Sequence, residues 1–227
     1  MRMPGWADPT DFGGNMSRAN TFSCLLVMLA VVVAAAALQA QGQAAPMCAS
    51  SEQIAVVRTA LAGKEPAPLG ATAAALKMPE ALVASALPHE QTHGVSAIHF
   101  QTIWKSIETW SDATTFIIKG PNLFEIQGPV GRGEPSTRSK FFNLHREGPG
   151  LAGHLRPDLY ASIYLLEIPG ASTTLRGIVF FDQFGDAVFS VYVPGEGVPA
   201  PEAVVTQFKA TSALILALPR LCAEYTQ

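Results

Sequence analysis

Side chains that could do chemistry gather between residues 132 and 156. Two of the five histidines, His145 and His154, lie in this window. The formal net charge of the whole chain is −3, yet the window is locally positive. Its charged residues are the cations Arg132, Arg138, Lys140, Arg146 and Arg156 and the acids Glu134 and Glu147. A histidine nitrogen, apolar side chains and several cations together suit a flat apolar ligand that carries a metal and acidic tails.

Two short strands around a turn are predicted to position these side chains. Residues 141–144 are apolar and β-prone, whereas residues 147–150 combine glycine with proline and favour a turn. Residues 152–155 then resume the strand and include His154. Just before the first strand, residues 128–139 are rich in Gly, Pro and Ser, and we expect a loop there.

The part of the chain before this region is predicted to be helical. Apolar residues recur at helical spacing over 50–61, 69–76 and 79–87, and Ser50 and Ser51 are candidate caps for the first helix. We therefore expect a helical subdomain over residues 47–90. It has few cations and no basic recognition face, so we interpret it as a packing subdomain rather than a DNA-binding motif. The net negative charge likewise argues against nucleic acid as a partner.

Residues 91–227 are predicted to form an α+β domain. Six or seven strands are expected, mostly paired as hairpins, because their connections are too short for crossover helices. The expected elements are a helix over 99–110, strands over 112–118, 123–126, 160–168, 175–181 and 187–193, and a closing helix over 202–218.

The cysteines and the other histidines give weaker signals. Cys24, Cys48 and Cys222 are odd in number, widely spaced and without a C-x-x-C pattern, so neither a disulfide scaffold nor a zinc site is expected. His89, His93 and His99 are spaced by four and six residues, but no cysteine or sufficient set of acids completes a metal site. A metal site is therefore not expected among them.

The N-terminal residues 1–46 read as a leader. No charged residue occurs between Arg18 and Glu52, and residues 22–38, from Phe22 to Leu38, are dominated by Leu, Val and Ala. This segment is long for a signal-peptide core and short for a membrane span. Arg18 supplies a positive flank, and Leu38-Gln39-Ala40 resembles a cleavage site. A signal peptide or a membrane anchor is one interpretation, and a functional protein that starts near Met47 is the other.

The two strands around the turn also carry a family resemblance. Phe141-Phe142-Asn143-Leu144 followed by Ala152-Gly153-His154-Leu155 resembles the core motif of the HutX/ChuX-type intracellular haem-utilisation carriers. The likeness extends from about residue 50 to 210. Further matching pieces, in the same order as in the family, are Ala86-Leu87-Pro88, Phe100 with Trp104, Trp110 with Thr114-Thr115, Leu123-Phe124-Glu125 and Phe180-Phe181.

The resemblance implies a fold and a function. Such carriers fold as a split antiparallel barrel packed with helices and pair as homodimers. We therefore expect a haem-binding carrier that holds haem in an apolar slot and passes it to an accepting or haem-degrading protein. The alternatives are a haem-degrading enzyme of the same fold group, and a membrane-tethered or exported interaction protein that has lost haem binding. The related enzymes contain two repeats and this chain has one, which favours the carrier.

The resemblance also assigns roles to residues. His154 matches the histidine of the family motif and is expected to ligate the haem iron, with His145 as the alternative ligand. Arg138, Lys140 and Arg156 are expected to hold the propionates. The aromatic residues that could stack on the porphyrin are Phe141, Phe142, Phe180 and Phe181, although core positions are the favoured interpretation of them. The competing interpretations are a structural strand histidine, solvated loop charges and core aromatics.

Two positions depart from the family pattern. The family carries tyrosine where Phe141 stands, and a phenolate can ligate ferric iron whereas a phenyl ring cannot. Some carriers have a histidine where Ile118 stands. The carriers begin directly at their first helix, and Met47 precedes that helix here, so we favour a cytoplasmic protein. If residues 22–38 are retained, a membrane-anchored or periplasmic protein is expected instead.

Overall fold

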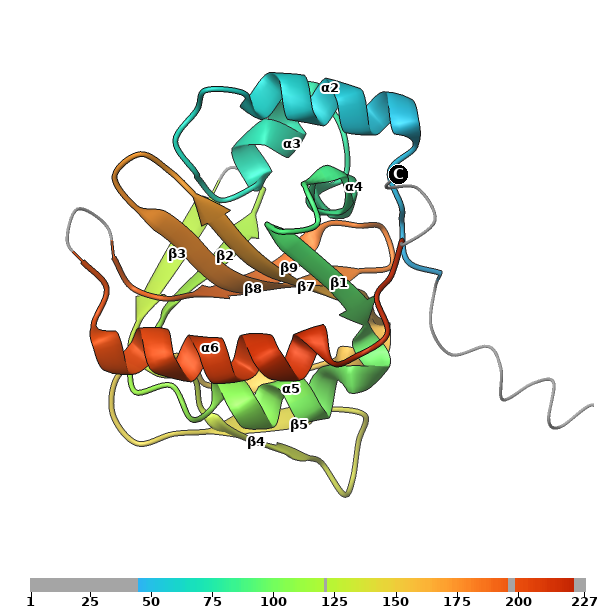
Figure 1. Cartoon of the computed structure of the whole chain (residues 1–227). Coiled ribbons are helices and arrows are strands. Elements are labelled where there is room, and N and C mark those ends of the chain that lie inside the picture. Colours follow the sequence, from blue (N-terminus) through green and yellow to red (C-terminus); the bar gives the residue numbers. More distant parts are fainter. Residues whose placement is uncertain (1–44, 121, 196–198, 223–227) are drawn as a thin grey trace, which may run out of the picture. The chain divides into compact units, whose positions relative to one another are not determined.

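A six-stranded antiparallel sheet lies at the centre of the fold (Figure 1). The computed structural model describes residues 45–120, 122–195 and 199–222, and residues 43–227 form one compact unit. The strands lie in the order β1 (Thr92–Ser96), β7 (Tyr160–Pro169), β8 (Thr174–Asp182), β9 (Ala187–Tyr192), β2 (Thr114–Lys119) and β3 (Asn122–Gln127). Hairpins join β2 to β3, β7 to β8 and β8 to β9, as their short connections predict.

Helices cover both faces of this sheet (Figure 1). On one face, α2 (Ser51–Leu61), α3 (Gly70–Leu76) and α4 (Glu80–Ala86) share a buried apolar cluster with Leu166 and Phe181. On the other face, α5 (Phe100–Ile107) and α6 (Glu202–Leu216) share a second cluster with Leu165 and Phe180. Side chains that alternate along β7 and β8 therefore enter two different cores, which explains why both strands read as continuous apolar runs.

The helix boundaries follow local signals in the sequence. Ser50 caps α2: its Oγ accepts a hydrogen bond from the Gln53 N–H, and the Gln53 side chain accepts one from the Ser50 N–H. Pro79 stands at the N-cap of α4. The predicted helix over 99–110 is shorter in the structure, where α5 follows a 3-10 turn over residues 97–99 and ends at Ile107. The closing helix ends close to its predicted end.

A second, three-stranded sheet lies beside α5 (Figure 1). It consists of β4 (Arg132–Pro135), β5 (Phe142–His145) and β6 (Gly153–Leu155), all antiparallel. The two predicted strands are thus confirmed as β5 and β6. The prediction that residues 128–139 form only a loop is wrong, because β4 lies within them. Its sequence, Arg-Gly-Glu-Pro, has none of the β-branched or aromatic side chains that indicate a strand.

A disulfide joins Cys48 to Cys222, with 5.4 Å between the two Cα atoms. The expectation that the cysteines form no disulfide scaffold did not foresee this bond. The two cysteines are separated by 174 residues, so their spacing gives no sign that the two ends of the described chain meet beside β1. The predicted apolar leader, Phe22 to Leu38, lies outside the described residues. Within the described residues, none of the helices has both the length and the apolar character that crossing a bilayer requires.

Candidate functional site

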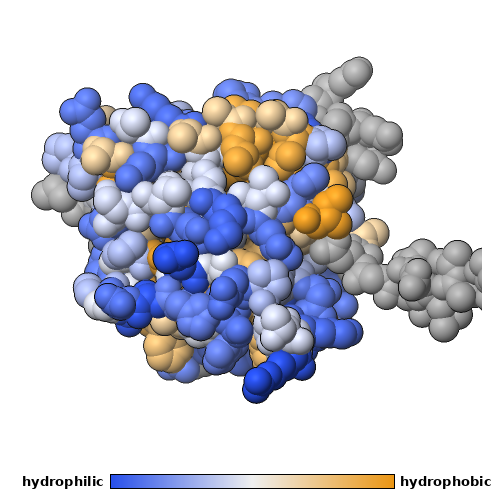
Figure 2. Space-filling model, turned by 90° about the horizontal axis from the view of Figure 1, so that it is seen from below, coloured by the Kyte–Doolittle hydropathy of each residue, from blue (hydrophilic) through white to orange (hydrophobic). Residues whose placement is uncertain are grey.

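The three-stranded sheet turns one face inward and the other outward. Along β5, Phe142 and Leu144 are buried, whereas Asn143 is half-buried and His145 is exposed. Asn143 pairs with His154 on β6 and with Glu134 on β4. These outward side chains belong to a mostly hydrophilic face, which Figure 2 shows from below, on the side of β4 and β5. The inner face packs on the core, and the outer face is free to carry chemistry.

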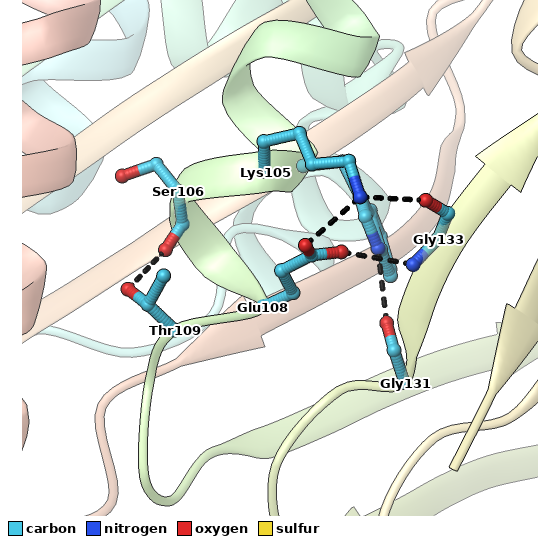
Figure 3. A network of polar contacts seen from close by, with 7 residues as sticks. Lys105, Ser106, Glu108, Thr109, Gly131 and Gly133 are labelled. Atoms are coloured by element: carbon cyan, nitrogen blue, oxygen red, sulfur yellow. Dashed lines mark hydrogen bonds and ion pairs between the residues drawn. The ribbon is translucent and has the colours of Figure 1, made fainter.

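Polar contacts from α5 fix β4 in place (Figure 3). The Gly133 N–H donates to Glu108 Oε2 at 2.8 Å, and Lys105 Nζ donates to the Gly133 carbonyl at 2.9 Å. Lys105 Nζ also lies 2.9 Å from Glu108 Oε1, so each charge compensates the other. The buried Trp104 ring donates its Nε1–H to the Gly131 carbonyl at 3.1 Å. Side chains of α5 and of its C-cap residue Glu108 thus satisfy backbone groups of β4 and of Gly131 just before it.

Gly133 is required by close packing. A Cβ at this position would lie 2.1 Å from Cε1 of Phe142 and 2.6 Å from Cδ1 of Trp104. The Phe142 ring meets the Phe100 ring edge-on at 5.0 Å and the Trp104 ring at 6.0 Å between centroids. Only a residue without a side chain lets β4 approach this aromatic cluster.

His154 is the exposed histidine of β6, and its ring is oriented by a neighbour. His154 Nδ1 lies 2.9 Å from Asn143 Oδ1. A carboxamide oxygen only accepts hydrogen bonds, so Nδ1 carries the proton of the neutral ring. The lone pair is then on Nε2, the atom that a histidine offers to a metal when its other nitrogen donates to a second residue. Asn143 was missed as a functional residue, although it stands in the motif that singled out His154.

A row of side chains leads from His154 to a surface hollow. The Phe141 ring is 42% exposed and lies 5.7 Å from the His154 ring, between centroids. On Phe141 also lies the Arg156 guanidinium, 5.8 Å from the ring centroid. Phe141 lines a hollow of about 460 Å³. The other residues of its wall include Ile98, Phe100, Gln101, Lys140, Phe142 and Asp158. His154 does not line this hollow itself, but it lies beside Phe141, which does.

The predicted propionate-binding cations differ in their availability. Lys140 lines the hollow, and Arg138 is exposed on the same loop, where its N–H donates to Ser136 Oγ at 3.2 Å. Arg156 is held by Asp158 through two bonds of 2.7 and 2.8 Å. The hydrogen bonds from Arg156 keep the pKa of Asp158 below its usual range. Asp158 lies just past the window of cations and was missed, although an acid two residues from an arginine was visible in the sequence.

His145, the alternative ligand, lies on the same outer face but in another hollow. Lys105, Arg132 and Glu134 line this second hollow of about 250 Å³ with it. His145 Nε2 lies 3.3 Å from Glu134 Oε1. In the register of β5 and β6, His145 and His154 are diagonal neighbours, so their side chains share one face. The structure therefore brings both histidines to this face, and places only His154 in contact with Phe141.

Other predicted candidates lie elsewhere. Phe180 and Phe181 are fully buried and belong to the two different core clusters, which agrees with the interpretation of these aromatics as core residues. Ile118 lies on β2 next to Gly70 of α3. His93 is buried in β1. Across the described ranges, no cluster of three or more His, Cys, Asp or Glu side chains has an arrangement that could hold a metal ion.

Comparison with known proteins places the chain in a family. Residues 94–210, more than half of the chain, match the family model for haem utilisation ChuX/HutX. The chain is 28% identical over 123 residues to the intracellular heme transport protein HutX of Vibrio cholerae, and this alignment spans 54% of the chain but only 63% of HutX.

Two solved structures extend the comparison to the fold. The crystal structure of ChuX superposes with a TM-score of 0.61 and 21% identity, covering 72% of this chain and 98% of ChuX. ChuS, an E. coli heme oxygenase, superposes with a TM-score of 0.57 and 15% identity, covering 75% of this chain and 50% of ChuS. At these identities the superpositions show the shared fold. Taken with the sequence match over residues 94–210, they show that the chain belongs to the ChuX/HutX haem-utilisation family.

Proposed function

We propose that this protein is a haem carrier and that His154 ligates the haem iron. The observation that carries the proposal is the hydrogen bond from His154 Nδ1 to Asn143 Oδ1, which leaves Nε2 available on an exposed face. A neutral imidazole nitrogen in this state is a good axial ligand. The name of the Vibrio cholerae relative, a heme transport protein, supports the same function.

The surroundings of His154 suit reversible binding of haem. Phe141 offers a ring face for the porphyrin and no ligand atom, so the protein supplies a single axial ligand from this side. A carrier must release its cargo, and one axial ligand makes release easier. Lys140 and Arg138 are the proposed partners of the propionates. Arg156 contributes less charge because Asp158 already pairs with it, and its role is to stack on Phe141.

A haem titration followed by absorbance tests the proposal. For the compact unit, residues 43–227, we expect a saturable Soret shift at one haem per chain. His154→Ala should abolish or move this shift, whereas the control His89→Ala, at an exposed histidine between α4 and β1, should leave it unchanged. Loss of the shift in His145→Ala instead would move the ligand to His145. No shift in the unmodified protein would sink the carrier proposal and favour an interaction protein that has lost its ligand.

Asn143 provides a sharper test of ligand orientation. Asn143→Leu keeps the size of the side chain and removes the acceptor of the His154 Nδ1–H. Loss of such an outer partner typically weakens metal binding by about 10–100-fold, and we expect haem affinity to fall within that range. Equal affinity in Asn143→Leu and the unmodified protein would contradict the proposed orientation of His154.

The proposal is a carrier rather than an enzyme. The heme oxygenase ChuS shares the fold, and the chain spans about half of its length. With haem bound, an electron donor and oxygen added, we expect the Soret band to persist over the period in which a haem oxygenase destroys it. Steady loss of the band with release of iron would favour the enzyme. The same absorbance band can also be used to measure transfer of haem to an accepting protein, which would complete the test of the carrier.

We also propose that the chain forms a homodimer through β3. This strand is the last of the six-stranded sheet, and the described residues supply no neighbour for its outer edge. Leu123 and Phe124 on β3 are 60% and 53% exposed, which favours burial against a second apolar edge. Light scattering should give the mass of a dimer for the unmodified protein and of a monomer for Leu123→Glu. A dimer in both would place the interface elsewhere.

A further inference from the structure

The segment that follows α6 lies along the free edge of β1. The Leu221 N–H donates to the Gly94 carbonyl at 2.8 Å. The Arg220 guanidinium donates to the carbonyls of Thr92 at 3.0 Å and His89 at 3.3 Å. The bonds to Gly94 and Thr92 satisfy carbonyls of β1 that are not bonded to β7, and the bond to His89 reaches the segment just before the strand. Residues 218–222, here called the C-terminal strap, therefore cover an edge that would otherwise be exposed.

The disulfide fastens this strap to the beginning of the folded chain. Cys222, the last described residue of the strap, is bonded to Cys48, which lies just before α2. The next residue, Ala49, is buried, and its N–H donates to Ser85 Oγ of α4 at 2.9 Å. The buried Tyr164 of β7 places its hydroxyl 3.6 Å from Cys222 Sγ. The bond thus ties the strap, the central sheet and the α2–α4 layer together.

We infer that the Cys48–Cys222 disulfide forms in the working protein, and that the chain is exported to an oxidising compartment by the apolar segment 22–38. Disulfides form and persist in such compartments, and they are rare where glutathione and thioredoxin keep thiols reduced. In the bond-forming exchange, the two thiols pass two electrons and two protons to the disulfide of a donor protein, which becomes a dithiol.

Two independent observations carry this inference. The first is the disulfide, which uses both cysteines of the described residues and closes a loop of 174 residues. The second is the leader-like sequence, with Arg18 as its positive flank and Ala40 at its small-residue end, only a few residues before Cys48. The chain would then differ in its compartment from the Vibrio cholerae relative, whose name describes it as intracellular. The inference stands whether or not the chain binds haem.

Expression of the full 227-residue chain in a bacterium with an oxidising periplasm tests the inference. Cell fractions are treated with a thiol-reactive polyethylene glycol before and after reduction, and the N-terminal residue is determined. We expect the chain outside the cytoplasm, with Cys48 and Cys222 labelled only after reduction. A cleaved leader would indicate a released protein, and a retained leader in the membrane fraction an anchored one. Cytoplasmic chain, or exported chain with both thiols labelled without reduction, would overturn the inference.

Matched variants separate loss of the disulfide from loss of folding. Reductant should lower the Tm of the unmodified protein by about 10 °C, because the closed loop no longer restricts the unfolded chain. The double variant Cys48→Ser/Cys222→Ser should have this lower Tm at the outset and show no response to reductant. A chain carrying His154→Ala should be exported and oxidised like the unmodified protein. If reductant leaves the Tm of the unmodified protein unchanged, a disulfide that stabilises the fold would be contradicted.

Discussion

The two sheets of this protein use the same strand geometry for different purposes. In the six-stranded sheet, β7 and β8 are buried on both faces, and their side chains fill two separate cores. In the three-stranded sheet, only the inner face is buried, through Phe142 and Leu144, and the outer face carries His145 and His154. The central strands of the large sheet have no free face for a ligand, and the small sheet has too little apolar surface to stand alone.

The difference shows where stability and function are divided. The small sheet relies on α5 for its position, through the bonds of Lys105 and Glu108 to Gly133 and the packing of Phe142 on Phe100. Because this support comes from the inside, the outer face can vary with little effect on folding. Substitutions in the large sheet should therefore cost mainly stability, and substitutions on the outer face of the small sheet should cost mainly haem binding.

Phe180→Ala should give the largest loss of stability. Phe180 is fully buried and its ring stacks on the Phe189 ring at 4.5 Å between centroids. Removal of a buried phenylalanine side chain typically costs about 3–5 kcal/mol. Urea denaturation followed by tryptophan fluorescence measures the change. The matched control, Phe141→Ala on the exposed face, should change the free energy of unfolding by no more than about 0.5 kcal/mol. Equal losses in the two variants would break the proposed division.

Gly133→Ala should come next, with a loss of about 1–3 kcal/mol from overpacking. The added methyl group would overlap Phe142 and Trp104, both of which are buried in the core. The small sheet should shift away from α5, so haem affinity should fall together with stability. Thr137→Ala, an exposed change in the neighbouring loop, is the control for both measurements. Unchanged stability in Gly133→Ala would show that β4 is not held as tightly as these contacts require.

Glu108→Gln should have a smaller effect, about 1 kcal/mol. The amide removes the negative charge that Lys105 compensates, and leaves one oxygen for the Gly133 N–H. The control is Glu134→Gln on the outer face of the same sheet, where the exposed contact with His145 is worth little. Denaturation curves of the two variants compare an inner and an outer carboxylate directly. A larger loss in Glu134→Gln would reverse the assignment of the two faces.

The hairpin strands of the large sheet were predictable from the sequence because they are apolar and their turns are short. The hairpins on either side of Gly120 and of Gly185 were predicted, as were α2 with its Ser50 cap and the closing helix α6. The predicted boundary of the helical subdomain at residue 90 stays a prediction. In the structure, α2–α4 share their buried cluster with β7 and β8.

The strand β4 and the disulfide were harder to predict, for physical reasons. β4 is held by hydrogen bonds between its backbone at Gly133 and the side chains of Glu108 and Lys105. Such bonds leave no alternation of apolar and polar residues in the sequence of the strand itself. Asn143 acts through His154, which only the register of β5 and β6 brings close. The disulfide depends on the meeting of two chain ends, which spacing along the sequence does not reveal.

A last prediction concerns acid and the β1 edge, and it should give the smallest effect at neutral pH. His93 is buried, and its Nε2 lies 3.3 Å from the Leu218 carbonyl of the C-terminal strap. Burial, with a further contribution from the nearby Arg220, lowers the pKa of His93. In the unfolded chain the group therefore takes up its proton at higher pH than in the fold, so stability should be lost as the pH falls below about 6.5. His93→Phe should flatten this part of the pH profile of the Tm, whereas His154→Ala should leave it intact. If the Tm depends on pH equally in the unmodified protein and in both variants, the acid response belongs to other groups. The two sheets would then not differ in their response to pH.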